Sequence, residues 1–427
     1  MKQKRKIIYF IFYWLLFSGT FFKFVYSHEI LAIVPDILVF YLLFSKSDKK
    51  NKVKAIKPYV GRYVPNIIGA FLLITTLSSI INMSGLLSYL WGLRMFLRYL
   101  GLFYLVIGTF KMKDVEKVKN WLYKAYYINL AVIGIQFFLL NINGDAISGI
   151  FSSNGGIVAY IFITSFIFTG DYCQKRLKLS RYCILMGAML FIAVVAEIKL
   201  LYFVVPLCFY AGYTVYKKFS MSHIVTIVVL YFSLIPLMTS IMSLYYDEAY
   251  VNQVFDSEYI ENETSHAYGF AEGIGFNRNT CVAMCSDNIL QDNLHKAIGY
   301  GLGSGSASAT FSTWIYKIHK RTTYHYFTAS YVMVEGGWSG LILYLSIFVT
   351  LLYRYWKVYK RTKDNIVKYW SGLGMLLSGV IYINLWYNAF PYTDGYLYYF
   401  MWALCFVGIK YRNQEIASKA CSTQNLN

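Results

Sequence analysis

Two cationic groups interrupt stretches of the chain that are otherwise apolar. Arg94 and Arg98 lie one helical turn apart in "WGLRMFLRYL", and Lys199 follows Glu197 by two residues in "AVVAEIKLLYFVVP". Arginine matches phosphate oxygens, and a cation in a low-dielectric environment stabilises growing negative charge strongly. With Arg321 they are candidates to bind an anion. Two alternatives remain open: the arginines extend toward a membrane interface, or the Glu–Lys pair only neutralises itself at a tight turn.

A general base and a flexible turn complete the set of candidate groups. Histidine titrates near neutral pH, so His325 in "RTTYHYF" is the first candidate base and Glu197 the second. A loop histidine without a catalytic role is the competing interpretation. Gly301 and Gly303 in "GYGLGSGS" would let the backbone pass close to a substrate, or they could belong to a plain linker. This stretch lacks the Gly-Lys-Ser/Thr end of a Walker loop, and no predicted strand precedes it.

The composition of the chain indicates whether these groups belong to a soluble protein or to a membrane protein. Of 427 residues, 57% are hydrophobic and only 14% are charged, and the mean hydropathy is +0.45. Soluble domains average about 25% charged residues, so the chain is predicted to be an all-α polytopic membrane protein. A spanning helix needs roughly 20 apolar residues. About twelve spans are predicted, near residues 7–22, 30–44, 63–81, 90–110, 121–140, 154–170, 183–196, 200–216, 223–244, 327–353, 366–388 and 395–410.

Basic residues predict the orientation of these spans. Most of the 40 lysines and arginines fall in segments that the twelve-span arrangement places on one side, which is therefore predicted to be cytoplasmic, with both termini. The net charge of +19 then favours attraction to anionic lipid over nucleic-acid binding, because no basic-aromatic module accompanies it. Residues 183–216 read as two short helices, so that Glu197 and Lys199 lie at an extracytoplasmic tip.

The same arrangement divides the chain into four parts. Nine spans occupy 1–244, one large extracytoplasmic loop occupies 245–326, three spans occupy 327–410, and 411–427 form a cytoplasmic tail. Loops of about 80 residues without a function are uncommon. Asp287, Asp292 and His295 in this loop are interpreted as a solvated helix face, so no metal and no cofactor are predicted. Whether Cys281 and Cys285 form a disulfide stays open, since a spacing of four on a helix suits one poorly.

Three stretches resemble the bacterial O-antigen polymerase and O-antigen ligase family of integral membrane glycosyltransferases. "ISGIFSSNGGIVAYIF" (147–162) is similar to the Gly-x-Phe and Asn-x-x-Ala pattern at the start of a helix in that family. "GYGLGSGS" (299–306) resembles its external Gly-x-Gly-Leu-Gly-Ser turn. "HYFTASYVMVEGGWSGLILYL" (325–345) resembles its His, aromatic, Glu-x-Gly-x-x-Gly-Leu segment, in which Glu335 matches the glutamate.

The resemblance implies a GT-C-like fold in the bacterial cytoplasmic membrane and a reaction at its outer face. A sugar hydroxyl of a lipid-linked acceptor would attack the anomeric carbon of an undecaprenyl-diphosphate-linked oligosaccharide. Under this hypothesis, Arg94, Arg98 and Lys199 would bind the diphosphate, and Gly301, Gly303 and Glu335 would contribute to substrate binding. A flippase and a chain-length regulator would be natural protein partners. The alternatives are a ligase of the same family, a lipid-linked oligosaccharide flippase and, with less support from the sequence, a nutrient transporter.

Overall fold

The computed structural model describes most of the chain. It covers residues 2–24, 31, 33–45, 60–142, 144–217, 269–271, 274–307 and 312–424, with single residues between 221 and 251. Most of the predicted ninth span, 223–244, and the first part of the predicted large loop lie outside the described residues. The domain boundaries at 244 and 245 therefore stay predictions.

The first half of the described chain consists of helices. They are α1 (Lys2–Phe24), α2 (Val34–Phe44), α4 (Tyr63–Ile81), α5 (Leu86–Thr109), α6 (Met112–Gly134), the π-helical turn η2 (Ile135–Leu139), the short η3 (Gly144–Ala146), α7 (Asn154–Cys173), α8 (Leu179–Val195) and α9 (Lys199–Tyr216). The break between α8 and α9 is the predicted hairpin, and Glu197 adopts a positive φ of 49° in it.

The second half begins with short elements and ends with long helices. A hairpin pairs β1 (Gly269–Ala271) with β2 (Ile274–Phe276), with Phe270 opposite Gly275. The other elements are α13 (Cys281–Met284), η4 (Cys285–Ile289), α14 (Asn293–Ile298), α15 (Trp314–His319), η5 (Lys320–Thr322), η6 (Tyr324–Tyr326), α16 (Thr328–Arg361), α17 (Asn365–Tyr387), α18 (Phe390–Thr393) and α19 (Tyr396–Gln424). The predicted boundary between a twelfth span and a tail falls inside α19.

Seven of the described helical segments are long and apolar enough to cross a membrane. They are α4, α5, α6 with η2, α7, α9, α16 and α17, and α2 and α8 are shorter apolar helices. The prediction of an α-helical, multi-pass membrane protein is thus confirmed. The number of twelve spans and the loop that depends on it stay predictions.

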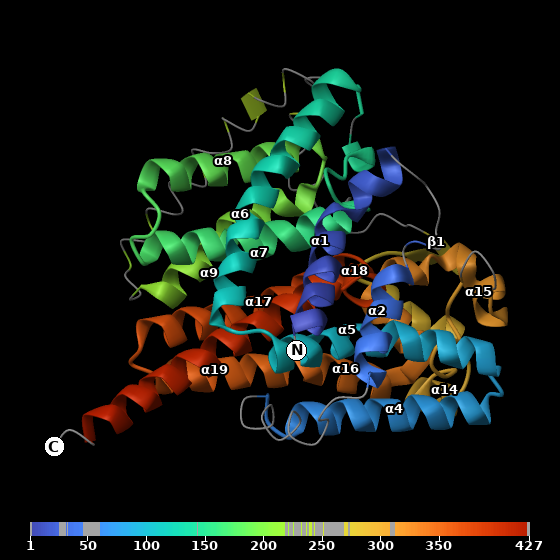
Figure 1. The fold of residues 1–427 in the computed structure, drawn as a ribbon. Coiled ribbons are helices and arrows are strands. Elements are labelled where there is room, and N and C mark those ends of the chain that lie inside the picture. Colours follow the sequence, from blue (N-terminus) through green and yellow to red (C-terminus); the bar gives the residue numbers. More distant parts are fainter. Residues whose placement is uncertain are drawn as a thin grey trace.

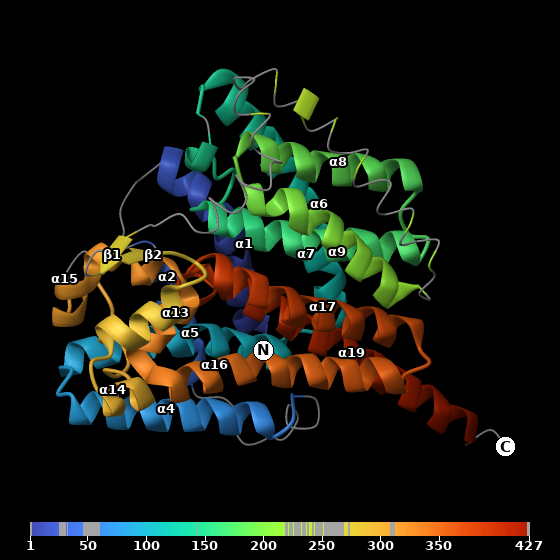
Figure 2. The same ribbon diagram turned by 180° about the vertical axis from the view of Figure 1, so that it is seen from behind.

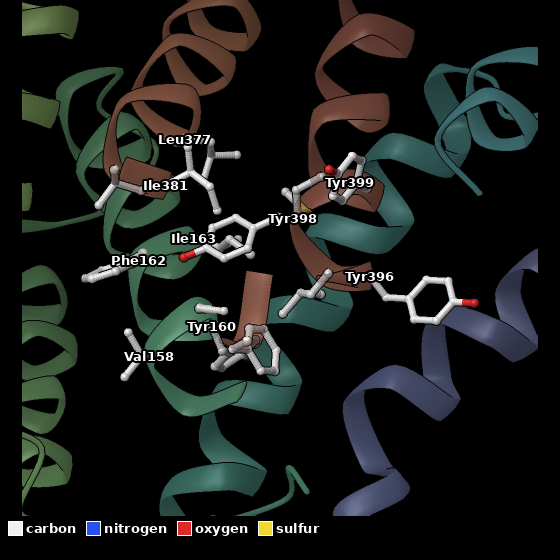
Figure 3. Close-up of a cluster of buried hydrophobic side chains, with 14 of the residues drawn as sticks. Val158, Tyr160, Phe162, Ile163, Leu377, Ile381, Tyr396, Tyr398 and Tyr399 are labelled. Carbon is white, nitrogen blue, oxygen red and sulfur yellow. The ribbon is translucent and has the colours of Figure 1, made fainter. Parts of the chain in front are cut away.

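Helix α7 forms the centre of the bundle because its surface is apolar on every side. Almost all of its residues are buried, which is typical of a helix enclosed by other helices. Figure 3 shows Tyr160 and Ile163 of α7 near Leu377 and Ile381 of α17 and Tyr398 of α19. Around this core, α16 packs against α4 and α17, and α19 packs against α17 and α5.

The two ends of the bundle carry different parts of the chain. In Figures 1 and 2, α14 and α15 lie at one end, while the α16–α17 turn, the α7–α8 turn and the C-terminus lie at the other. Helices α8 and α9 lie on the side of the bundle away from α4 and α14. The segment around α14 and α15 is therefore expected to face the opposite aqueous phase from the C-terminal end of α19.

Cysteine labelling from each side of the membrane tests this arrangement. In a variant without the seven native cysteines, Lys317→Cys on exposed α15 should react with a membrane-impermeant maleimide added outside intact cells. Asn413→Cys on the exposed part of α19 should react only after the membrane is opened. Labelling of both positions from the same side would contradict the arrangement.

Candidate functional site

The two arginines of α5 share one buried carboxylate. Arg94 Nη1 and Arg98 Nη1 each lie 3.1 Å from Asp36 Oδ2, and Asp36, on α2, is only 1% exposed. The hydroxyl of Tyr396, at the start of α19, donates to Asp36 Oδ1. Because one carboxylate faces two guanidinium groups, this contact alone leaves an excess of positive charge.

The contacts of Arg98 bind it firmly to the protein. Its Nη1 donates to both carboxylate oxygens of Asp36. Its Nη2 donates to the carbonyl oxygen of Thr393 and to the hydroxyl of Tyr99. The residue is 6% exposed, so the structure gives this arginine a paired interior position in place of an extension toward the interface.

Arg94 keeps donors that no protein group uses. Its Nε and Nη1 are buried and donate no hydrogen bond, so its contact with Asp36 is an ion pair only. Its Nη2 faces Met95 Sδ at 3.5 Å, and its guanidinium lies 3.8 Å from the ring centre of Trp91. Leaving buried donors unpaired is costly. Arg98 Nε also lacks a partner, but the Arg94 side chain is more exposed, 18% against 8%, so Arg94 is the cation of this pair that an anionic ligand reaches more readily.

Glu335 holds the glycine-rich turn of residues 299–306 on α16. Its carboxylate accepts a hydrogen bond from the hydroxyl of Tyr392 and a long one, 3.4 Å, from Ser306 Oγ. The backbone N–H groups of Gly303 and Gly305 also donate to it. With these donors the carboxylate is fully engaged, so the structure makes Glu335 the anchor of the turn.

The glycines of this turn are required by close backbone packing. Gly301 and Gly303 have φ values of +96° and +78°. A Cβ at Gly303 would lie 1.9 Å from the carbonyl oxygen of Ser88 on α5, and a Cβ at Gly301 would lie 2.4 Å from Ser79 Oγ on α4. The turn is thus wedged against α4 and α5, and the same Ser79 hydroxyl accepts from the N–H of Leu302 at 2.9 Å.

Helix α16 is kinked where it contacts this glycine-rich turn. Gly337 interrupts α16 with φ 59° and ψ −162°, and a Cβ there would lie 2.6 Å from the backbone of Ala297. A Cβ at Gly299 would in turn lie 2.5 Å from the backbone of Glu335. The Glu-x-Gly pattern of the sequence therefore marks the place where the turn and the kinked helix meet.

His325 lies beyond the turn, in η6. Its Nδ1 is buried without a hydrogen-bond partner, and the rings of Tyr316 and Tyr326 lie 5.2 and 4.7 Å from its own. Burial lowers the pKa of His325 below its ordinary value, so the ring is neutral near pH 7. The neighbouring Tyr324 hydroxyl donates to the carbonyl of Gly305 at 2.6 Å, which joins this histidine's segment to the turn.

The remaining predicted residues lie on elements other than α5. Arg321 is exposed on η5. Glu197 and Lys199 lie at the α8–α9 hairpin, where the Glu197 carboxylate is next to Gly144, 3.0 Å from where a Cβ there would be. Cys281 and Cys285 carry free thiols, and these face the carbonyl oxygens of Arg278 and Ser330, respectively.

Four residues near Arg98 or Glu335 were not predicted from the sequence: Asp36, Tyr392, Asp394 and Tyr396. Asp36 carries a usable signal, because an ionisable residue in the short apolar segment "IVPDILVF" suggests a function by default. Burial raises the pKa of Asp394 to about 7, although the nearby Arg98 opposes this effect. The tyrosines gave no signal among the 42 in the chain, because only packing selects which of them reach the carboxylates.

No protein-family model matches the chain, and no curated protein matches it. The three resembling stretches are short, and the structure gives two of them a local packing explanation, namely the turn of residues 299–306 and the kink of α16. The structure connects α5, which carries Arg94, to the turn that Glu335 holds, and connects that turn through Tyr324 to the segment of His325.

The packing of the turn predicts an unequal cost of alanine substitutions. Gly303→Ala should lower the free energy of unfolding by more than about 1 kcal/mol, because it combines a positive φ with a clash against α5. Gly379→Ala is the matched control, since a Cβ on this helical glycine meets nothing within 4 Å and alanine favours helix by about 1 kcal/mol. Thermal unfolding of the two purified variants and of the unchanged protein measures both changes in stability. Equal melting temperatures would contradict the assigned packing.

Proposed function

We propose that this chain is a membrane glycosyltransferase that polymerises oligosaccharide repeat units carried on undecaprenyl diphosphate. The observation that carries the proposal is Arg94, a partly buried cation whose Nε and Nη1 donate no hydrogen bond, on the helix against which the glycine-rich turn packs. The proposed site is in the bilayer at its outer face, and a flippase and a chain-length regulator are the proposed partners. The family resemblance stated above suggests the substrate class.

The leaving group explains the need for a buried cation. When the acceptor hydroxyl oxygen forms its bond to the anomeric carbon, the bond from that carbon to the diphosphate oxygen breaks, and the lipid diphosphate leaves with the electron pair. A cation away from water stabilises this growing charge, and removing one such donor typically costs roughly 10²–10³-fold in rate. Arg94 Nε and Nη1 donate no hydrogen bond, and the ion pair of Nη1 with Asp36 holds the side chain in place.

The attacking hydroxyl must lose its proton to a base. His325 fits this role because its Nδ1 is unpaired and burial keeps the ring neutral by lowering its pKa. Asp394 is a second group with a pKa near neutrality, about 7. The glycine-rich turn contacts the segments that carry both proposed groups, since Gly303 packs on α5 and the carbonyl of Gly305 accepts from Tyr324, the residue before His325.

Lipid analysis of a strain that lacks the gene distinguishes the candidate functions. A polymerase predicts single repeat units, on the lipid or on their final acceptor, and no polymer. Accumulated long polymer on the lipid would instead indicate a ligase, and repeat units that stay on the inner face would indicate a flippase. Unchanged polymer and unchanged lipid intermediates would contradict all three.

Complementation with single variants connects that phenotype to the site. Arg94→Gln should fail to restore polymer at a normal amount of membrane protein. Arg361→Gln is the matched control, because it removes the same charge from an exposed position at the far end of α16, and it should restore polymer fully. Full activity of Arg94→Gln would remove this arginine from the proposed site.

The pH dependence of the reaction tests His325. A neutral base with a lowered pKa predicts that kcat/KM rises with pH below about 6.5, as the imidazolium loses its proton, and is level near pH 7. His325→Gln should abolish this acidic limb and reduce kcat by roughly 10²–10⁴-fold. An unchanged acidic limb in the variant would assign the titration to another group, with Asp394→Asn as the next variant to measure.

A further inference from the structure

One face of helix α6 carries exposed lysines around a shallow groove. Lys113, Lys117 and Lys124 recur at intervals of four and seven residues, so they lie along one face of the helix, and all three are exposed. They line a groove of about 570 Å³ together with Trp121 and Glu116. Three lysines against one glutamate give the groove a net positive charge.

The protein does not neutralise this charge itself. In the part of the chain that the structure describes, no carboxylate forms an ion pair with Lys113, Lys117 or Lys124. The nearby Asp114 is already engaged, because it pairs with Arg5 at 3.0 Å and accepts from the Tyr9 hydroxyl and the Lys111 N–H, each at 2.8 Å. The lysines are therefore free to bind an anion from outside the chain.

The surroundings of the groove suit a molecule with both an anionic and an apolar part. Lys124 Nζ lies 5.1 Å from the Trp121 ring centre, and tryptophan favours the headgroup level of a bilayer. Farther along the same candidate span, exposed apolar side chains follow, with Ile135 47% and Phe138 52% exposed. Basic residues next to the apolar part of a spanning helix are typical of contacts with anionic lipid.

The position of the groove along α6 indicates which leaflet of the bilayer it faces. Helix α6 begins toward the end of the bundle that carries the C-terminus and the α16–α17 turn (Figures 1 and 2). The groove is therefore far from α14 and α15, and a ligand there is separate from the site proposed around Arg94.

We propose that this groove binds the phosphate-bearing headgroup of an anionic phospholipid from the leaflet on the C-terminal side. The lysine ammonium groups contact the phosphate oxygens, Trp121 lies at the level of the glycerol backbone, and the acyl chains follow the apolar surface of α6 and η2. This inference does not depend on the glycosyltransferase proposal.

Native mass spectrometry of the purified full-length protein tests it. The protein is titrated with phosphatidylglycerol or with phosphatidylcholine, and binding constants are compared for the unchanged chain and four variants. We expect phosphatidylglycerol to bind preferentially, and the triple variant Lys113→Gln, Lys117→Gln, Lys124→Gln to bind it at least about tenfold more weakly. The triple arginine variant at the same positions should retain binding, because it keeps the charge.

The matched control removes equal charge elsewhere at the same end of the bundle. Lys360→Gln, Arg361→Gln and Lys363→Gln together should leave phosphatidylglycerol binding unchanged. An equal loss in this control would show a non-specific effect of net charge and overturn the proposal, as would equal binding of phosphatidylcholine. Single Lys113→Glu, at an exposed position, should weaken binding even if the triple variant is unstable, and unchanged binding by this variant would also overturn it.

Competition with soluble glycerol phosphate separates the two sources of phosphate. A lipid site predicts that millimolar glycerol phosphate leaves the bound phosphatidylglycerol in place, because the acyl chains contribute to binding along α6. Complete displacement at that concentration would assign the groove to a free phosphate compound and overturn the lipid assignment.

Discussion

The shared carboxylate of Asp36 is the interaction on which the rest of this structure depends. Two arginines within an apolar helix would be very costly without a partner, since even a paired buried charge recovers its desolvation only with good geometry and further hydrogen bonds. Asp36 supplies the partner from α2, Tyr396 satisfies its second oxygen from α19, and Thr393 accepts from Arg98. Three segments far apart in the sequence are therefore fixed relative to one another, while Nε and Nη1 of Arg94 and Nε of Arg98 donate no hydrogen bond.

A second constraint, the carboxylate of Glu335, is connected to the first through Tyr392. The Tyr392 hydroxyl donates to Glu335, while its backbone carbonyl accepts from Tyr99 at 3.1 Å, and Tyr99 in turn contacts Arg98. The arginine cluster and the glycine-rich turn are therefore parts of one hydrogen-bonded network. A buried network of this kind is rigid when its members are satisfied, whereas Arg94 Nε and Nη1, Arg98 Nε and His325 Nδ1 lack hydrogen-bond partners.

The two proposed anion sites differ in the physics of binding. Arg94 is partly buried, so an anion there would be held by a few oriented donors in a medium that screens charge weakly. The α6 groove is exposed, so its lysines act as mobile, hydrated charges whose attraction falls with salt. The first arrangement suits stabilisation of charge that develops during a reaction, whereas the second suits exchange with lipid headgroups. Their separation to different ends of the bundle follows from the direction of α5 and α6, which are consecutive helices joined by a short turn.

The sequence by itself determined the medium, the helices and a part of the site. Apolar composition and runs of about 20 residues are local properties, so the membrane class and the positions of α4, α5, α7, α9, α16 and α17 could be predicted. The proximity of Arg94 and Arg98 could also be predicted, because a spacing of four places them on one helix face.

Only the tertiary structure decided which residues face these arginines: Asp36 lies 62 residues before Arg98, and Tyr396 lies 360 residues after Asp36. Helical periodicity gives each helix a buried face but not its partner, because partner choice depends on close packing between helices. The grouping of Lys199 with Arg94 and Arg98 stays a prediction, and the fit of Gly303 against α5 became visible only in the folded chain.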